Sequence, residues 1–157
     1  MRILAVVLLL VVISACDDNR LSEQNIDIDN KAWVADTTYS FQFNVPDIRE
    51  RYRLYMNVRN TLSYPYENLY INYQLTDTLN NIIKKELVNY NLFDPRTGRP
   101  YGEGLGDVFD HQFLLIDNFK FDRTGPFRLN MQHYMRMDTL PEILSVGYRV
   151  EYASVED

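Results

Sequence analysis

The stretch YSFQFNV, residues 39–45, alternates strictly between apolar and polar side chains before Pro46 ends it. A two-residue period is typical of a β-strand that buries one face and exposes the other. The same period follows at once, because one face of residues 52–58 carries Tyr52, Leu54, Met56 and Val58. These two segments predict neighbouring antiparallel strands with one covered face.

Short alternating segments recur through the rest of the chain. They lie at residues 69–75, 82–93, 108–116, 127–133 and 146–152, and turn-forming stretches separate them. Residues 137–145 (MDTLPEILS) are predicted to make one helical turn, but no segment has the period of a longer amphipathic helix. The pattern predicts an all-β fold over residues 36–157, a single antiparallel β-sandwich that is immunoglobulin-like or jelly-roll in outline.

Residues 1–15 (MRILAVVLLLVVISA) combine one positive charge, an apolar run and two small residues. This order is typical of a secretory signal, and the run is too short for a permanent membrane helix. The ending Ile13-Ser14-Ala15-Cys16 resembles a bacterial lipobox, in which the cysteine is acylated and becomes the mature N-terminus. We therefore expect a cleaved signal peptide over 1–15, lipidation of Cys16, and a polar tether over residues 16–35. An ordinary signal peptide with a chance cysteine is the alternative.

The net charge of −6 and the single cysteine limit the classes of partner and fold. An acidic chain is unsuited to nucleic acid or to an anionic lipid surface, so the membrane is expected as a partner only through lipid on Cys16. One cysteine can form no internal disulfide, so the domain must derive its stability from buried apolar surface.

Residues suited to catalysis are few, because the chain holds only two histidines. His133 falls on the apolar face of its predicted strand, where a buried structural histidine is the common case. Four candidate metal ligands lie close in sequence, namely Glu103, Asp107, Asp110 and His111. Their spacing matches no calcium loop, and zinc usually takes more His or Cys ligands. We expect no catalytic residue, metal, cofactor or small-molecule substrate; a metal-dependent hydrolase would need Asp107, Asp110 and His111 to converge.

A row of arginines has two interpretations. Arg51, Arg53 and Arg59 point away from the apolar face of residues 52–58. The row is either an ordinary solvated strand face or a basic strip that docks an acidic partner.

Twelve tyrosines also allow two interpretations. Tyr55, Tyr64, Tyr66 and Tyr70 fall on predicted outer faces or in turns. Tyrosine suits protein interfaces and carbohydrate platforms, because it presents a large area at a low entropy cost, and it is equally common at strand edges.

Residues 94–106 interrupt the alternation, and three of the six glycines fall between positions 102 and 106. The run GEGLGD (102–107) lacks the lysine and the following helix of a phosphate-binding loop, so its glycines favour a tight turn. A connection of this length is typically functional or mobile.

Several motifs in a fixed order resemble those of one family. Trp33 is followed by Arg59-Asn60-Thr61, Tyr64-Pro65-Tyr66 and Asn68-Leu69, then by GEGLGD (102–107) and VGYRV (146–150). Together with the lipobox, these motifs at these spacings resemble the GldH family of gliding-motility lipoproteins from the Bacteroidota, over nearly the whole mature chain.

The resemblance implies a non-enzymatic lipoprotein of the cell envelope, anchored to the inner or outer membrane, that serves surface gliding. In these bacteria gliding is tied to the type IX secretion system, whose envelope proteins would be partners. The expected contact residues are Arg51, Arg53, Arg59, Tyr64, Tyr66, Gly102, Gly104, Leu105 and Asp107. A surface glycan-binding lipoprotein is the alternative from another class, since a β-sandwich rich in tyrosine serves that role equally well.

Overall fold

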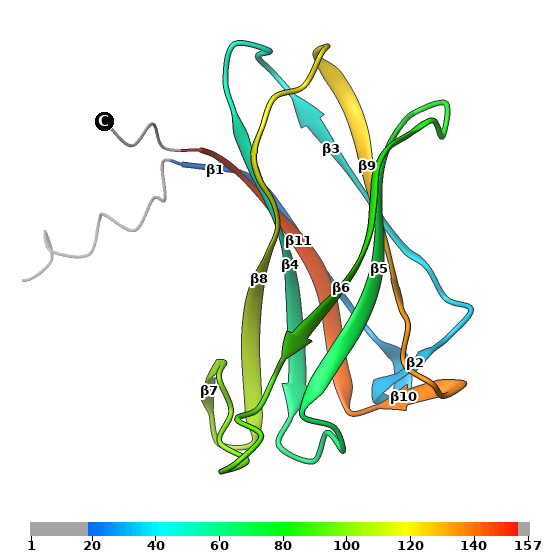
Figure 1. The fold of residues 1–157 in the computed structure, drawn as a ribbon, viewed down its shortest axis with the longest axis vertical. Coiled ribbons are helices and arrows are strands. Elements are labelled where there is room, and N and C mark those ends of the chain that lie inside the picture. Colours follow the sequence, from blue (N-terminus) through cyan, green and yellow to red (C-terminus); the bar gives the residue numbers. More distant parts are fainter. Residues whose placement is uncertain (1–18, 154–157) are drawn as a thin grey trace, which may run out of the picture.

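The computed structural model describes residues 19–153, which form two facing layers of antiparallel strands (Figure 1). The five-stranded sheet has the order β1-β11-β4-β8-β7, the four-stranded sheet has the order β3-β9-β5-β6, and β10 pairs with β2. The strands of these sheets are β1 (Arg20–Asp27), β2 (Ala32–Val34), β3 (Tyr39–Val45), β4 (Tyr52–Thr61), β5 (Asn68–Asp77), β6 (Ile82–Asn91), β7 (Glu103–Leu105), β8 (Val108–Phe119), β9 (Gly125–His133), β10 (Thr139–Pro141) and β11 (Ile143–Tyr152). The predicted all-β antiparallel sandwich is confirmed.

The alternating residues fill the space between the two sheets, as the sequence predicts. Tyr52, Leu54 and Met56 of β4 are fully buried. Phe41 and Phe43 of β3 meet Tyr148 of β11, with ring centroids 5.3 and 5.9 Å apart. Each fully buried aliphatic or aromatic side chain contributes roughly 1.5–3 kcal/mol, so this layer of side chains is the main source of stability.

Tyrosine hydroxyls join the two sheets along both sides of the sandwich. On one side, Tyr148 of β11 donates to the carbonyl of Gln42 in β3 at 3.2 Å. On the other side, Tyr73 of β5 donates to the carbonyl of Leu115 at 3.1 Å, and Tyr90 of β6 donates to that of Leu114 at 2.5 Å. These bonds satisfy buried hydroxyls and fix the spacing of the layers.

Three local predictions are wrong. Residues 39–45 and 52–58 are not neighbouring strands, because β3 belongs to the four-stranded sheet and β4 to the five-stranded one. The expected tether over 16–35 does not hold from Arg20 onward, because Arg20–Asp27 is strand β1 and pairs with β11. This strand lies at a sheet edge with most of its side chains exposed, so it lacks an apolar period. The expected helical turn over 137–145 is also wrong, since Thr139–Pro141 forms β10. There Leu140 pairs with the fully buried Trp33, and this tertiary contact overrides the local turn signals.

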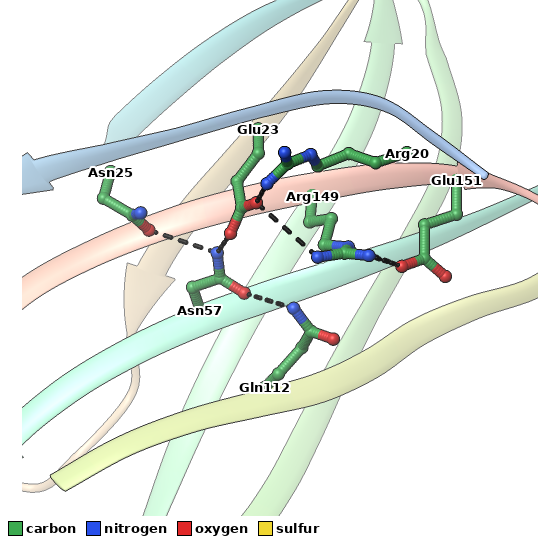
Figure 2. Close-up of polar contacts among 7 residues, drawn as sticks. All are labelled: Arg20, Glu23, Asn25, Asn57, Gln112, Arg149 and Glu151. Carbon is green, nitrogen blue, oxygen red and sulfur yellow. Dashed lines mark hydrogen bonds and ion pairs between the residues drawn. The ribbon is translucent and has the colours of Figure 1, made fainter. Parts of the chain in front are cut away.

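A hydrogen bond from Asn57 of β4 to Asn25 of β1 passes over β11, which lies between these two strands (Figure 2). Gly147 of β11 leaves room for this bond. It lies between Asn25 of β1 and Asn57 of β4 in register. The Asn57 amide nitrogen donates to Asn25 Oδ1 at 3.2 Å and to Glu23 Oε1 at 2.8 Å. A Cβ at position 147 would overlap Asn25 Oδ1 and the backbone oxygen of Gln24. The glycine therefore holds β1, β11 and β4 together by leaving room above the sheet.

Gly147→Ala should lower the free energy of unfolding by about 2–3 kcal/mol, because the added methyl group meets backbone as well as a side chain. Urea unfolding of the variant and the wild type measures this loss. Gly98→Ala is the matched control, since Gly98 has a φ of +68° but no atom near its missing Cβ, and its loss should be about 1 kcal/mol. Equal losses at the two positions would contradict the steric account.

Candidate functional site

The glycine run of residues 102–107 forms a β-hairpin at one end of the sandwich. Gly104 of β7 pairs with Phe109 of β8, and Gly106 makes the turn with a φ of +70°. A Cβ on Gly104 would overlap the backbone oxygen of Val108, so the two strands approach closely only because this residue is glycine. The hairpin presents Leu105, which is 92% exposed, at its tip.

The connection before this hairpin is ordered by its own hydrogen bonds. The carboxylate of Asp94 accepts from the backbone nitrogens of Arg96 and Thr97, both at 2.9 Å. These bonds lower the pKa of Asp94. The backbone nitrogen of Tyr101 donates to the carbonyl of Leu92 at 2.9 Å, which returns the chain to the sheet. The predicted irregular connection is thus a defined loop.

The hairpin is bonded to the segment that follows β4. The backbone nitrogen of Leu62 donates to the carbonyl of Asp107 at 2.7 Å, directly after the pairing of Thr61 with Val108. Thr61 also donates its hydroxyl to Glu142 Oε2 at 2.5 Å. Two motifs that are far apart in sequence, Arg59-Asn60-Thr61 and GEGLGD, therefore meet at one end of the sandwich. We call this end, with residues 62–67 and 101–107, the loop end.

At the loop end, some of the predicted contact residues are exposed and others are buried. Leu105 is exposed, and so is Asp107. Tyr64 is only 5% exposed; it donates its hydroxyl to the carbonyl of Asn68 at 2.9 Å and stacks on Phe93, and burial raises its pKa. Its burial leaves it no surface to offer a partner, so Tyr64 is a core residue. Tyr66 is half-buried beside it.

Two exposed apolar residues at the loop end were not predicted from sequence. Leu62 is 52% exposed and Tyr101 is 57% exposed, and both neighbour the hairpin in chain order or through backbone bonds. In the sequence, the only indication for each residue is a large apolar side chain within a predicted turn. That both turns lie beside residues 102–107 is known only from the fold. With Leu105, the loop end thus carries three exposed large apolar side chains.

The arginine row is paired with carboxylates or backbone. Arg59 makes two hydrogen bonds to Asp110, at 2.7 and 3.1 Å, and Arg53 bonds Asp117 at 2.9 Å. Arg51 donates to the carbonyl of Asn118 at 3.0 Å. Arg59 lies at the loop end and the other two lie at the opposite end of β4, so the structure separates them. Such exposed pairs contribute about 0–1 kcal/mol each, and they remove most of the positive field of the row.

A polar network covers the outer face of the five-stranded sheet between these pairs (Figure 2). Gln112 donates to Asn57 Oδ1 at 3.1 Å, which extends the Asn57 bonds to β8. Glu23 also pairs with Arg20 at 3.0 Å and with Arg149 at 3.7 Å, and Arg149 pairs with Glu151. The side chains of this face bond chiefly to one another, across four neighbouring strands.

A groove of about 600 Å³ on this face includes Arg59, Gly102, Glu103 and Asp110 in its walls. His111 borders the groove and is 5% exposed, with Gly102 so close that an added Cβ would lie 2.8 Å from its Nε2. Burial disfavours the imidazolium and lowers the pKa of His111 to about 4, against a smaller opposite effect of Asp110. Within residues 19–153, no three His, Cys, Asp or Glu side chains lie close enough to share a metal ion. The convergence that a metal-dependent hydrolase would need is thus not found there.

Burial explains the second histidine as well. His133 is 2% exposed, packs edge-on against Trp33, and accepts the backbone N–H of Met135 at Nδ1, at 3.3 Å. Desolvation lowers its pKa too. In the part of the chain that the structure describes, no helix has the length and apolar character needed to span a bilayer.

Comparison with known proteins gives one family. The family model described as GldH lipoprotein matches residues 20–150. A protein named gliding motility lipoprotein GldH homolog, from Christiangramia forsetii, is 28% identical over 149 residues, which cover 90% of each chain. Gliding motility lipoprotein GldH from Flavobacterium johnsoniae is 24% identical over 148 residues, again 90% of each chain.

Solved structures resemble the fold only weakly. A family GH115 4-O-methyl-α-glucuronidase has a TM-score of 0.45 at 12% identity, with 88% of this chain and 18% of that chain covered. The VP2 subviral particle of infectious bursal disease virus has a TM-score of 0.39 at 11% identity, with 84% and 32% covered. The chain spans a third or less of either protein, and neither indicates a function.

The low pKa of His111 predicts a loss of stability in acid. The unfolded histidine has a pKa near 6.5 and takes up a proton before the folded one does, so the free energy of unfolding falls as the pH drops from 7 to 5. His111→Phe removes this proton and should reduce the fall by on the order of 1–2 kcal/mol. Urea unfolding of both proteins at the two pH values measures it. His133 titrates in both proteins and so cancels, and an unchanged pH dependence would contradict the assignment.

Proposed function

The chain belongs to the GldH lipoprotein family, and we propose that it is a cell-envelope lipoprotein that serves gliding motility through protein–protein contacts at its loop end. The observation that carries the proposal is the family match, which spans residues 20–150 and so includes strands of both sheets. Two relatives of nearly the same length carry gliding motility in their names. We further propose that its partners include envelope proteins of type IX secretion, and that it has no catalytic activity.

The proposed anchor is a lipid on Cys16, after removal of residues 1–15. These residues lie outside the described range, and the lipobox that ends at Cys16 supports the anchor. Residues 17–19 separate Cys16 from the first strand residue, Arg20. Even a fully extended chain of this length spans no more than about 14 Å, so the end of the sandwich near Arg20 would lie close to the membrane. This shortens the proposed tether to residues 17–19.

The loop end lies at the opposite end of the five-stranded sheet from Arg20. Arg20 pairs with Glu151, whereas Asp27, at the other end of β1, pairs with Ser145 beside Arg59. Figure 1 shows β1 starting at the upper left and β7 at the lower left. Eight residues of strand span roughly 25 Å, so the loop end would point away from the membrane, toward proteins of the envelope.

The exposed chemistry of the loop end suits a protein partner. Leu62, Tyr101 and Leu105 supply apolar surface, and Asp107 supplies a charge near Leu105. Interfaces commonly combine such an apolar centre with a polar rim. Gly102 and Gly104 contribute by shaping the hairpin, and Arg59 contributes through its pair with Asp110 at the same end.

Leu105→Glu should reduce capture of partners without changing the fold, because the Leu105 side chain is 92% exposed and is not part of the core. The measurement is a crosslinked pull-down of the full lipoprotein from its native envelope, read by mass spectrometry. Recovery of gliding or type IX secretion components with the wild type, and a severalfold loss with the variant, supports the proposal.

The matched control is Leu79→Glu, which places the same charge at an 80% exposed leucine in the turn between β5 and β6. It should leave recovery unchanged. Recovery of glycan-uptake proteins alone would contradict a role in gliding, and equal losses from both variants would contradict the assignment of the loop end.

Cys16→Ser should abolish membrane attachment, because serine cannot carry the thioether-linked lipid. Cys16 is the single cysteine of the sequence, so no other thiol can carry that lipid instead. Detergent phase partition of envelope fractions measures the change, from the detergent phase to the aqueous phase. Retention of the variant in the detergent phase would show that the chain is held by something other than lipid at Cys16.

A further inference from the structure

The outer face of the four-stranded sheet differs in chemistry from the rest of the acidic chain. Strands β3 and β9 contain no acidic residue, and β5 has only Asp77 at its last position. Glu86 of β6 receives a hydrogen bond from Tyr73, whose side chain points into the core. The five-stranded sheet, by contrast, carries carboxylates and arginines on its outer face. One face of the sandwich is therefore nearly free of negative charge.

Four primary amides occupy the centre of this face. Asn72 and Gln74 of β5 stand directly opposite Gln132 and Asn130 of β9 in the antiparallel register. All four are half-buried, and they line a hollow of about 330 Å³. We call these four residues the amide strip.

Among the described residues, two side chains of the amide strip make hydrogen bonds to the protein, and the other two make none. Gln132 donates from Nε2 to the carbonyl of Ala35 at 2.5 Å, and Asn130 donates from Nδ2 to Thr76 Oγ1 at 3.4 Å. Within residues 19–153, the side chains of Asn72 and Gln74 make no hydrogen bond to the protein. Each primary amide offers two donors and an acceptor. The strip thus presents several donors and acceptors side by side.

A second hollow, of about 520 Å³, continues the same face beyond the amide strip. Its walls include Tyr70, Leu87, Tyr134 and Met135. Tyr70 precedes Asn72 by two residues on β5, and Tyr134 follows Gln132 by two residues, so both rings continue the two rows of the strip. Tyr134 is 62% exposed and Tyr70 is 39% exposed. From Tyr70 to Thr76 the face runs for roughly 20 Å along the strands.

We propose that this face binds a linear, neutral glycan. Sugar hydroxyls both donate and accept hydrogen bonds, so they match the mixed donors and acceptors of the amide strip. The C–H faces of sugar rings stack on exposed aromatic rings, which Tyr70 and Tyr134 provide at one end. The amide strip lies outside the loop end, and only the aromatic hollow adjoins it, through Tyr66. The site would give the lipoprotein a contact with envelope or surface polysaccharide in addition to its protein partners.

Two other kinds of occupant fit this face less well. A protein interface usually has its apolar residues at the centre and its polar residues at the rim, whereas here the amides are central and the aromatic hollow lies at one end. An anionic ligand would meet three cations spread over the face, because Lys85 pairs with Gln74, Arg128 pairs with Thr76, and Arg136 lines the aromatic hollow. They do not converge on the amide strip, and Arg128 already donates to Asn80 Oδ1 at 3.3 Å. Uncharged, hydroxyl-rich chains are the chemistry that the strip matches.

The test uses the full lipoprotein in nanodiscs, with cellohexaose, laminarihexaose and mannohexaose as neutral probes and tetragalacturonate as an anionic one. Saturation-transfer NMR detects binding and calorimetric titration measures affinity. We expect at least one neutral hexasaccharide to bind. The double substitution Asn72→Ala/Gln74→Ala should weaken it roughly tenfold or more, because two hydrogen-bonding groups are lost.

Two further variants separate binding from folding. Tyr134→Ala should also weaken binding. Because the Tyr134 side chain is 62% exposed, its removal should not unfold the domain, so weaker binding would reflect loss of the ring itself. Gln42→Ala removes an amide from the same sheet outside both hollows and should leave affinity unchanged. Absence of binding by every neutral probe, binding of tetragalacturonate alone, or binding that the double variant leaves unchanged would each overturn the proposal.

Discussion

The whole structure depends on burying two alternating faces against each other without a covalent crosslink. The chain has one cysteine, so no disulfide can restrain the sandwich. Phe41 and Phe43 of β3 meet Tyr148 of β11 between the sheets, and tyrosine hydroxyls bond the layers along both sides. Because register must keep every apolar side chain inside, a slip by one residue would expose an entire face. The outer faces are built on strands whose register the core has already set.

Three residues of the sequence motifs have structural roles in this fold. Gly147 leaves room for the bond between Asn57 and Asn25, Tyr64 is buried against Phe93, and Gly104 allows β7 to approach β8. Residues that identify a family therefore need not be those that contact its partners. The large apolar side chains exposed at the loop end are Leu62, Tyr101 and Leu105, and of these only Leu105 belongs to a motif. Motif membership alone is a poor guide to the contact surface.

The two outer faces differ because their polar groups are satisfied in different ways. On the five-stranded sheet, Arg53 and Arg59 pair with carboxylates, Arg51 bonds a backbone carbonyl, and amides bond one another across strands. On the four-stranded sheet, Asn72 and Gln74 are half-buried with unused donors and acceptors. Half-buried amides without hydrogen-bond partners gain the most hydrogen-bond energy when a ligand of matching chemistry binds.

The sequence by itself determined the fold class, most strand positions and the family, because these depend on local periodicity and on motif order. Alternation within β3, β4, β9 and β11 directly reports which side chains face the core. Tertiary structure alone decided that Arg20–Asp27 is a strand, that Leu140 meets Trp33, and that Tyr64 is buried. It also separated Arg59 from Arg51 and placed Asn72 opposite Gln132. These are contacts between segments far apart in the chain. A local sequence pattern does not show which distant residue will pair with an edge strand, pack against a ring or bond a charged group.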